Sequence, residues 1–489
     1  MVRKMKCYDE TNINSIKKYS EKLVGKTFLD IINESSLTAK EKNDAIIKYG
    51  NKHFKGGLGT LLEEVYFGYK ANSKQESDFN KVGMELKSSP YEINRNGTLK
   101  AGERLSVTMV PHNREIEKDF YKSDVWHKIR LLLLVYYLRN KALESRLQFK
   151  IDYSYLFKIP DEDLKIIIED YNKIVNKVIS GNAQDISEGD TLYLGACTKG
   201  ATAKKSTYPQ FYGSHKPAKA RNFCLKQSYM SYILNTYIKP NKETYESILK
   251  NIDDFVKGSS FEEMVTKCIN KYKGKTDKEL CYMFSRKYNN NKSQWSDLAY
   301  RMLGIKSNKA EEFVKANIVV KSIRIEENGK IRENMSFPAF KYKEIIKEKW
   351  DESKVRNYFE TTKFLFVIYK KEKGNFVLKG SQFWNMPLCD LDGEVKSGWE
   401  KVVSTIKEGI KLIVTKKGVS NNLLKKKDNR IIHIRPHAKK SYHRLEDGTI
   451  IGSNPANANE LPDGRMMTNC CFWINNGYIL SQIKDEYKY

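Results

Sequence analysis

Apolar positions recur at helical spacing in several parts of the N-terminal half of the chain. Residues 11–50 show this pattern with a break at Gly25 and a new start at Phe28, so we expect helices on both sides of the break. The same spacing predicts an amphipathic helix over residues 161–181 and the last helix of this half over residues 222–238.

Strand-like patterns alternate with these helices. Residues 84–88 alternate between apolar and polar side chains, and residues 105–110 and 191–194 also predict strands. The apolar run over residues 131–138 fits a buried central strand or a helix packed on one. The mixture predicts an α/β fold.

The strand expected over residues 84–88 carries the candidate chemistry. Glu85 and Lys87 lie two positions apart and therefore share one face, while Leu86 turns toward the core. A Val-Gly step before the strand lets Asp78 approach the same edge. Two carboxylates and one ammonium at one point suit metal-dependent phosphodiester hydrolysis, because the carboxylates hold a hard divalent cation and the lysine orients or activates water.

Other interpretations of these residues stay open. In a chain rich in Lys and Glu, an isolated Glu-x-Lys also arises by chance on a solvated strand face. A second copy of the pattern lies at residues 392–396, where Asp-Gly predicts a turn and hence a loop. A short buried helix ending at Gly68 carries Glu63 and Glu64, and either acid lies on the wet face or points toward the site.

Length and charge narrow the class of protein. A chain of 489 residues is too long for one core and suggests two or three domains. With 40% hydrophobic and 12% aromatic residues, wholesale disorder is excluded. The net charge of +27 implies an anionic partner, with nucleic acid ahead of a membrane surface.

The start of the chain lacks the apolar core of a signal peptide, and the longest apolar run, residues 131–138, is too short to span a bilayer. The eight cysteines form no Cys-x-x-Cys pair, which argues against zinc and against a disulfide framework. We therefore expect a cytoplasmic protein with reduced thiols and no membrane partner.

The second half repeats the first at matching spacings. Phe79 lies eight positions before Lys87, and Phe313 lies eight positions before Lys321, which aligns Glu85 with Val319. Further matches in the same order are Tyr171 with Trp399, Phe223 with Phe472 and Tyr229 with Tyr478. Valine offers a cation no oxygen ligand, so the second copy is expected to be catalytically inactive and kept for binding.

These motifs resemble the MutH/Sau family of GATC-specific DNA endonucleases, in the double-length form of its restriction-enzyme branch. Gly-x-Leu-Leu-Glu, Asp-Phe followed by Gly-x-Glu-Leu-Lys, His-Lys before the apolar run, and Phe-x-Leu-Lys occur in family order. The resemblance covers residues 20–240 well and residues 295–489 more loosely. It implies two tandem restriction-endonuclease-like PD-(D/E)xK domains, each with a mixed central sheet flanked by helices, the second a degenerate copy.

The resemblance also implies a division of the chain. We expect a catalytic MutH-like domain over residues 1–245, a charged helical linker over residues 246–292 and an inactive DNA-binding domain over residues 293–489.

The site residues follow from the same resemblance. Asp78, Glu85 and the backbone carbonyl of Leu86 would bind Mg²⁺. Catalytic roles fall on Asp78, Glu85, Lys87 (which would serve the water), Lys128 (which would support the site) and Glu63. The helical acid is Glu63 if counted from Gly59, which we prefer, and Glu64 if counted back from Gly68.

The resemblance places a DNA-reading loop at residues 197–199 and a second such loop at residues 433–438. Lys199 would contact bases, since lysine pairs with guanine O6 and N7, and the small-residue loop around it fits a phosphate backbone or is a flexible surface loop. Cys224 occupies the place of a tyrosine that senses adenine methylation, so we expect tolerance of that methylation. The predicted DNA-binding residues are Lys199, Lys204, Lys205, Cys224, Lys226, Arg435, His437 and Lys439.

The expected function is a type II restriction endonuclease that uses Mg²⁺ to cut double-stranded DNA before the G of GATC, leaving a 5′-phosphate. One live site per chain requires two chains or two visits to cut both strands, and the second half would bind a second GATC site. A cognate DNA methyltransferase is expected genetically. The alternatives are a MutH-like mismatch-repair nicking endonuclease and a non-catalytic basic DNA-binding protein.

Overall fold

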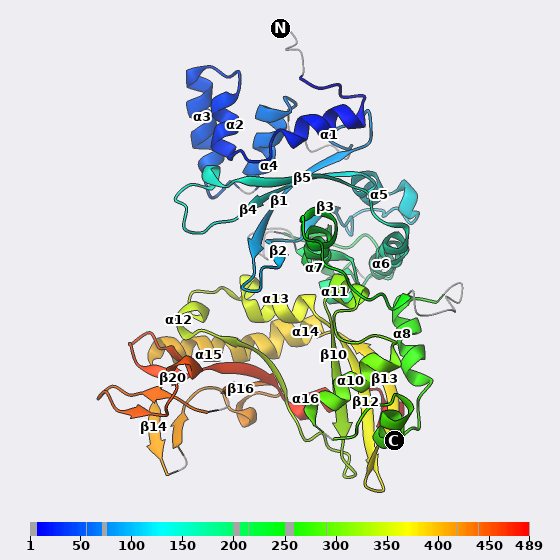
Figure 1. Ribbon diagram of the computed structural model, residues 1–489, viewed down its shortest axis with the longest axis vertical. Helices are drawn as coiled ribbons and strands as arrows, with labels where there is room; N and C mark the ends of the chain where they lie inside the picture. Colours follow the sequence, from blue (N-terminus) through cyan, green and yellow to red (C-terminus); the bar gives the residue numbers. More distant parts are fainter. Residues whose placement is uncertain are drawn as a thin grey trace. The chain divides into compact units, whose positions relative to one another are not determined.

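The computed structural model describes residues 7–54, 56–70, 76–198, 206–213, 215–249, 259–289, 291–416, 418–438 and 440–488. The chain forms two compact units (Figure 1). Unit 1 comprises Met1–Tyr245 and Val314–Ala316, and unit 2 comprises Glu246–Phe313 and Asn317–Tyr489. The predicted DNA-binding residues Lys199, Lys204, Lys205 and Lys439 lie outside the described residues.

A mixed four-stranded sheet forms the centre of unit 1. Its order is β2-β1-β4-β5, with bounds β1 Glu85–Ile93, β2 Leu99–Ala101, β4 Leu132–Leu138 and β5 Ile151–Phe157. β1 runs parallel to β4, while β2 and β5 pair antiparallel with their neighbours. β4 is buried from Leu132 to Tyr136, so the apolar run is confirmed as a central strand.

Short helices cover this sheet, and their apolar residues form one core with β1 and β4 (Figure 1). They are α1 Ile13–Glu21, α2 Phe28–Glu34, α3 Ala39–Gly50 and α4 Gly57–Leu61, and α4 continues into a π-helical turn, Leu62–Tyr66. Thr27 and Thr38 cap α2 and α3 through capping boxes. The helical pattern of residues 11–50, its break at Gly25 and the short buried helix before Gly68 are confirmed.

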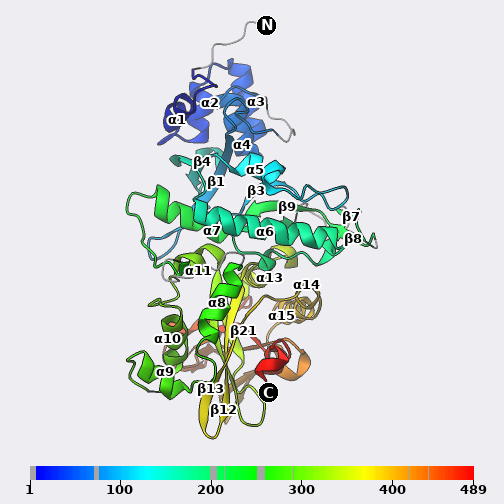
Figure 2. The ribbon, with the colours of Figure 1, turned by 90° about the vertical axis from the view of Figure 1, so that its right-hand side faces the viewer.

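A second sheet of unit 1 has the order β3-β9-β6, with bounds β3 Leu105–Met109, β9 Arg221–Leu225 and β6 Leu194–Thr198. The long helix α6, Asp161–Ile179, packs against β6 of this sheet (Figure 2), while α7, Gln227–Ile233, packs against β2 of the first sheet. The helix expected over residues 222–238 is therefore wrong at its start. Residues 221–225 pair with strands on both sides, and this tertiary pairing overrides their local pattern.

The strand expected over residues 191–194 begins only at Leu194. The carboxylate of Asp170 on α6 accepts the backbone N–H groups of Leu192, Tyr193 and Leu194 at 2.6–3.0 Å. These bonds hold the preceding backbone as a connection, so it does not pair in the sheet before Leu194.

The two main sheets of unit 2 repeat the order of β1-β4-β5 and of β3-β9-β6 in unit 1, without a strand in the place of β2. One is β10-β12-β13, in which β10 runs parallel to β12 and β13 antiparallel to it, and the other is β11-β21-β16. Their bounds are β10 Ile318–Ile325, β11 Met335–Phe340, β12 Lys363–Glu372, β13 Asn375–Trp384, β16 Ile432–Pro436 and β21 Cys470–Ile474.

Helices α13 Lys354–Thr361, α14 Leu388–Asp390, α15 Lys396–Glu408 and α16 Asn476–Ser481 complete this part of unit 2. A separate hairpin follows α15, formed by β14 Leu412–Thr415 and β15 Gly418–Asn421. A small four-stranded sheet has the order β18-β17-β20-β19, with bounds β17 His443–Arg444, β18 Ile450–Ile451, β19 Ala458–Glu460 and β20 Met466–Thr468.

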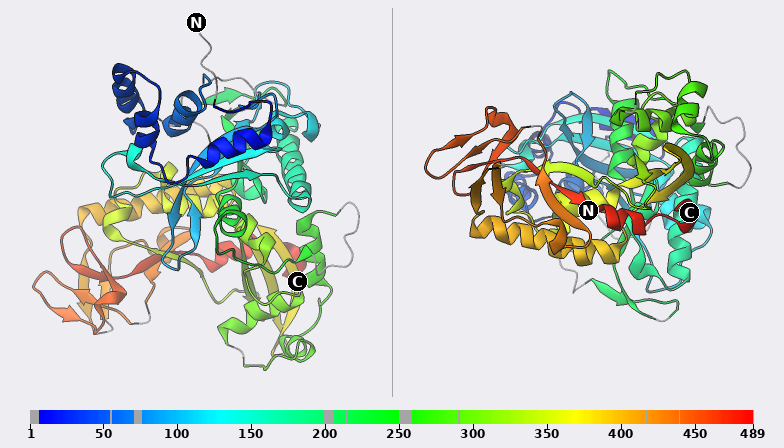
Figure 3. Two further views of the ribbon diagram at one scale, coloured as in Figure 1. Left: turned by 45° about the horizontal axis from the view of Figure 1, so that its top comes forward. Right: turned by 90° about the horizontal axis from the view of Figure 1, so that it is seen from below.

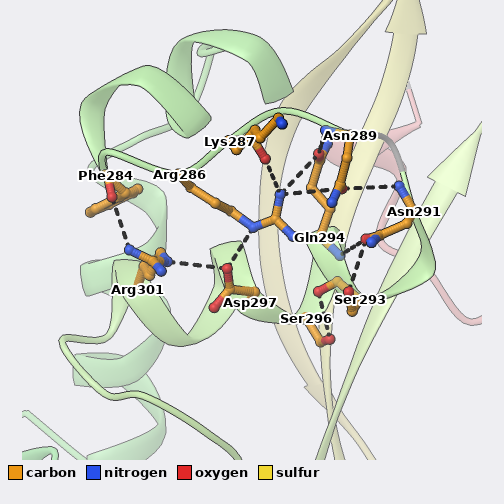
Figure 4. A network of polar contacts seen from close by, with 10 residues as sticks. All are labelled: Phe284, Arg286, Lys287, Asn289, Asn291, Ser293, Gln294, Ser296, Asp297 and Arg301. Carbon is orange, nitrogen blue, oxygen red and sulfur yellow. Dashed lines mark hydrogen bonds and ion pairs between the residues drawn. The ribbon is translucent and has the colours of Figure 1, made fainter.

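Residues 246–292 are not a separate linker, in contrast to the expectation. Helices α8 Phe261–Asn270 and α9 Asp277–Met283 pack against β13, and α10 Lys292–Met302 packs against β10. Figure 4 shows how the turn between α9 and α10 is held: Arg286 Nε lies 2.5 Å from Asp297 Oδ2, and Arg286 Nη1 donates to Gln294 Oε1 at 3.2 Å. The segment expected to be a linker is part of unit 2.

The second Asp-x-Glu-x-Lys copy is helical, so the expected loop is also wrong. Residues Leu391–Val395 form a π-helical turn that leads into α15. Asp392 accepts hydrogen bonds at 2.9 Å from Arg356 Nε and from Trp350 Nε1. This acid therefore serves a buried ion pair and leaves the Asp78–Glu85 stretch as the candidate site.

All eight cysteines are free thiols. Within the described part of the chain, no helix has the length and apolar character needed to cross a membrane.

Candidate active site

The loop before β1 folds back on the first residue of that strand. Phe79 and Met84 exchange backbone hydrogen bonds of 2.9 and 3.2 Å, which close a tight turn. Gly83 holds this turn with φ +64°, and a Cβ at this position would collide with the guanidinium of Arg130. The glycine is therefore required by its backbone angle and by the close approach of an arginine.

This turn brings the two predicted acids together. The backbone N–H of Asp78 donates to Glu85 Oε2 at 3.3 Å, and the backbone N–H of Leu86 donates to Asp78 Oδ2 at 2.9 Å. Glu85 is 2% exposed. Each carboxylate is thus positioned by the backbone beside the other.

Two lysines converge on a single oxygen of Glu85. Lys87 Nζ, from the same face of β1, lies 2.8 Å from Glu85 Oε1. Lys128 Nζ, from helix α5 (Asp124–Ile129), lies 3.1 Å from the same oxygen and donates to the Glu76 carbonyl at 3.4 Å. A buried carboxylate is tolerated here because two ammonium groups neutralise it.

The two candidate helical acids face different surroundings. Burial, together with the nearby charge of Asp78, raises the pKa of Glu63 to about 7. Glu64 instead accepts hydrogen bonds from Tyr49 Oη at 2.5 Å and from Lys48 Nζ at 2.8 Å. Burial raises the pKa of Glu64, but these two bonds outweigh it and hold the pKa below its usual value.

Asp78 shares the electrostatic environment of Glu63. Burial, and then the charge of Glu85, raises the pKa of Asp78 to about 6. Glu63, Asp78 and Glu85 form a cluster of acids in which the charge of one disfavours the charge of another. Glu63, rather than Glu64, belongs to that cluster.

Sequence reasoning did not single out Tyr69. Its hydroxyl is buried, and it finds no hydrogen-bond partner among the residues that the structure describes. Burial, together with the charges of Asp78 and Glu63, raises the pKa of Tyr69. Tyr69 and Asp78 also line a cavity of about 180 Å³ beside the loop of residues 76–81. No sequence pattern marks this tyrosine; only the fold brings it to the acids.

The acids of this cluster offer oxygen ligands to a divalent cation. Among the described residues no group of three or more His, Cys, Asp or Glu side chains is arranged to hold a metal ion. Asp78 and Glu85 nevertheless lie side by side, and burial, with the charge of Glu85 after it, raises the pKa of Asp78; a bound cation would offset both effects. Carboxylate and carbonyl oxygens are the ligands that Mg²⁺ prefers, so the chemistry of the residues fits this ion.

The predicted DNA-binding residues of unit 1 that can be located are buried. Lys226 is 1% exposed and donates from Nζ to the Thr191 carbonyl at 2.5 Å, so we correct its assignment from DNA contact to a structural role. Cys224 lies on strand β9, not on the last helix, and its side chain is buried next to Cys197.

In unit 2, Arg435 and His437 are exposed at the end of β16. The Arg435 guanidinium lies 5.2 Å from the centre of the Trp473 ring, and His437 Nδ1 lies 3.3 Å from Cys471 Sγ. Both side chains are accessible in the described structure, as a contact with DNA requires.

Comparison with known proteins bears directly on this site. The family model of the DNA mismatch repair enzyme MutH matches residues 67–170, which include Asp78, Glu85, Lys87 and Lys128 but not Glu63. The DNA mismatch repair proteins MutH of two Escherichia coli strains, SMS-3-5 / SECEC and K12 / DH10B, are each 27% identical over 187 residues, which is 37% of this chain and 78% of each MutH.

The similarity to a restriction enzyme extends over both units. The type II restriction enzyme Sau3AI of Staphylococcus aureus is 33% identical over 470 residues, which is 89% of this chain and 93% of that enzyme. Unit 1 accordingly has the MutH-like restriction-endonuclease fold. With its acids and lysines gathered at the start of β1, this chain belongs to the MutH/Sau family of DNA endonucleases, in the double-length branch of type II restriction enzymes.

Proposed function

We propose that this chain is a Mg²⁺-dependent restriction endonuclease that cuts DNA before the G of GATC and leaves a 5′-phosphate. The observation that carries the proposal is the convergence of Asp78, Lys87 and Lys128 on Glu85. Metal-assisted phosphodiester hydrolysis requires acids that hold the metal ion and ammonium groups beside them, and this strand edge carries both. The GATC sequence and the cut position come from the family resemblance.

Asp78, Glu85 and the Leu86 carbonyl would hold the Mg²⁺ ion, which supplies positive charge for the scissile phosphate and the leaving oxygen. Lys87 is 25% exposed, so it reaches solvent while touching Glu85, and it would orient the attacking water and lower the free energy needed to form hydroxide. Lys128 is 11% exposed and would hold the Glu85 carboxylate in place. Glu63 would accept a proton near neutral pH, in line with its pKa of about 7.

In the proposed reaction, the water oxygen forms a bond to phosphorus and the bond from phosphorus to the 3′ oxygen breaks. The water proton leaves through Glu63 or solvent, and the 3′ oxygen takes up a proton to give a 3′ hydroxyl. The products are therefore a 5′-phosphate and a 3′ hydroxyl.

We also propose that unit 2 is a degenerate copy of unit 1 that binds a second GATC site. The order of β1-β4-β5 recurs in β10-β12-β13, and the order of β3-β9-β6 recurs in β11-β21-β16. Tyr229 donates to Asp163 at 2.9 Å in unit 1, and Tyr478 donates to Asp390 at 2.7 Å in unit 2, at matching places. Val319 stands near the start of the parallel strand β10, where Glu85 stands on β1, so unit 2 lacks the acid.

We propose three further features of the function. Tolerance of adenine methylation rests on the family resemblance alone, because Cys224 is buried on β9 beside Cys197. Cutting of both strands would use two visits or a second chain on the DNA, and a cognate methyltransferase would protect the host.

The deciding experiment incubates the purified chain with unmethylated and adenine-methylated plasmid in Mg²⁺, and maps the ends. We expect double-strand cuts before G of GATC in both plasmids, and Lys87→Ala should lower the rate by about 10³-fold or more, in the range of other lost catalytic groups. The matched control is Lys100→Ala on β2, an exposed lysine away from the acids.

Three results would contradict parts of the proposal. If Lys87→Ala cuts at a near-normal rate, the assignment of the active site is wrong. If only the unmethylated plasmid is cut, the predicted tolerance of adenine methylation is wrong. Nicks without double-strand cuts would favour the MutH-like nicking function, which the match to a mismatch repair family supports.

A further inference from the structure

The hairpin of β14 and β15 presents apolar side chains to solvent. Ile413 and Val414 are 58% and 56% exposed, although both are β-branched apolar residues. The hairpin is a two-stranded ribbon in which Ile413 pairs with Ser420 and Val414 with Val419, so the side chains of Ile413 and Val414 point to opposite faces. Val414 shares its face with Leu412, which packs on the core of unit 2, and Ile413 lies on the other face. Its strands pair only with each other among the described residues, and Figures 1 and 3 show the ribbon projecting from unit 2 in orange.

The ribbon is firmly anchored at its base. Leu412 packs against the apolar core of unit 2, and Leu423 and Leu424, which follow β15, are buried in it. Asn422 Oδ1 accepts the backbone N–H of Lys411 at 2.9 Å, which ties the two ends of the hairpin together. A ribbon held in this way keeps its exposed side chains in a fixed place, so they are available to a partner without a large ordering penalty.

The charge around the ribbon identifies the kind of partner. The sequence from Gly409 to Lys427 contains no Asp or Glu. Five of its lysines are exposed in the described structure and form no ion pair with described residues: Lys411, Lys416, Lys425, Lys426 and Lys427. A polyanion complements such a surface, whereas a second copy of this chain, with its net charge of +27, would be repelled.

The shape of the ribbon selects among polyanions. The major groove of B-DNA admits a two-stranded β-ribbon, and strands in that groove place alternate side chains against base edges. Thymine presents a methyl group there, which is an apolar surface for a side chain such as isoleucine. Lysines at the flanks of the ribbon would meet the phosphates on either side.

We propose that the β14–β15 hairpin of unit 2 enters the major groove of duplex DNA, with Ile413 against a thymine methyl group and Lys411 and Lys416 on the phosphates. This inference rests on the proposed binding of a second site by unit 2 and assigns a contact surface to it. The hairpin lies outside the strand β16 and the following residues that the family resemblance assigns to DNA reading.

The experiment uses the full chain in EDTA, so that no DNA is cut, and measures its affinity for a duplex with two GATC sites. We expect Ile413→Ser to weaken binding about tenfold, in the range of one lost base contact, while Val414→Ser on the opposite face of the ribbon should have a much smaller effect. Replacing every thymine by uracil, which removes only the methyl group, should weaken the wild type but have a much smaller effect on the Ile413→Ser variant. Such coupling shows that the two changes remove the same contact.

The lysines give a second, independent readout. Lys411→Gln with Lys416→Gln should lower the slope of log affinity against log salt by about 0.9 for each lysine, because each releases one counterion fewer. The matched controls are Ile47→Ser on α3 of unit 1, an isoleucine 66% exposed, and Lys100→Gln. Thermal unfolding of each variant checks that the fold is intact.

The outcomes separate this inference from the function on which it rests. Failure of the wild type to bind the second site would refute the proposed role of unit 2. In another outcome, the wild type binds the second site normally while uracil substitution weakens the wild type and the Ile413→Ser variant equally. That result would refute the groove contact but not the proposed role of unit 2. Serine substitutions that change the sedimentation of the free protein, but not its DNA affinity, would assign the hairpin to self-association and overturn the proposal.

Discussion

Lys128 Nζ lies 3.1 Å from Glu85 Oε1, and both side chains are largely buried, at 11% and 2% exposure. Removing Lys128 leaves the buried Glu85 carboxylate with the more exposed Lys87 ammonium, so the loss should be a part of the roughly 3 kcal/mol that an uncompensated buried charge costs. Lys87 also contacts Glu85 Oε1 but is more exposed, so its loss should cost less stability.

We therefore predict that Lys128→Ala lowers the melting temperature more than Lys87→Ala does, while Lys87→Ala lowers the cleavage rate more. Thermal unfolding at pH 8 and cleavage of a single-site duplex measure the two effects. Lys128→Arg keeps the charge and should recover most of the stability. If both alanine variants melt alike, the buried pair does not have the structural role assigned to it.

Glu63 should make the free protein less stable as the pH rises. Its pKa is raised from 4.5 to about 7 in the folded chain, so the folded state binds this proton more tightly than the unfolded state does. The favourable contribution is fully present below about pH 4.5 and is lost as the pH rises through about 7. Glu63→Gln should therefore stabilise the metal-free protein by about 1–2 kcal/mol at pH 8, allowing for solvent screening, and by almost nothing at pH 4.5.

Glu64→Gln is the matched control, since the neighbouring acid gains stability from Lys48 and Tyr49. It should lower stability at pH 8 or leave it unchanged. Denaturant unfolding at both pH values measures the free energy of unfolding of each variant. If Glu64→Gln raises this free energy at pH 8 and Glu63→Gln does not, Glu64 rather than Glu63 is the acid of the site.

Gly83 offers a test of the turn that presents Asp78. Gly83→Ala places a Cβ at φ +64° and pushes the Arg130 guanidinium aside, whereas Gly97→Ala meets a similar φ of +78° with nothing within 4 Å. Both variants should lose about 1 kcal/mol of stability to the left-handed backbone. Only Gly83→Ala should lower cleavage, by about tenfold, because it also displaces the Arg130 guanidinium from the turn that carries Asp78.

Arg130→Ala completes this comparison. If the displaced guanidinium is what matters, this variant should reproduce the loss of cleavage without the backbone strain. Equal cleavage rates in all three variants, measured on a single-site duplex, would show that Arg130 has no part in the reaction.

The accessible side chains at the end of β16 allow unit 2 to be tested within the whole chain. Arg435→Ala with His437→Ala should lower the cleavage of a two-site plasmid to the rate of a one-site plasmid and leave the one-site rate unchanged. Truncation is a poorer test, because Lys315 of the segment Val314–Ala316 lies 2.6 Å from Asp163 in unit 1 and both are buried. A deletion of residues 246–489 would remove Lys315 and leave the buried Asp163 without this ion pair.

The sequence predicted the parts of the fold that follow from local patterns. The apolar run became β4, the amphipathic pattern became α6, and the side chains of Glu85 and Lys87 do meet on one face of β1. These features depend on the period of a strand or a helix, which neighbouring residues set.

The remaining features depend on tertiary contacts that a local pattern does not contain. Residues 221–225 became a strand because β3 and β6 offer hydrogen bonds on both sides. The burial of Lys226 depends on the Thr191 carbonyl, and the position of Tyr69 beside Asp78 depends on the π-helical turn before it. The segment 246–292 is part of unit 2 because its helices pack against β13 and β10.

The double ammonium contact on Glu85 Oε1 has a consequence for the order in which the reactants assemble. A cluster of bare carboxylates repels a phosphodiester until metal arrives, but here Lys87 and Lys128 are built into the chain and offset that repulsion in advance. On the proposed mechanism, the protein would therefore hold DNA while magnesium is scarce and begin cutting when the ion is supplied, because the two lysines already offset the charge of the acids.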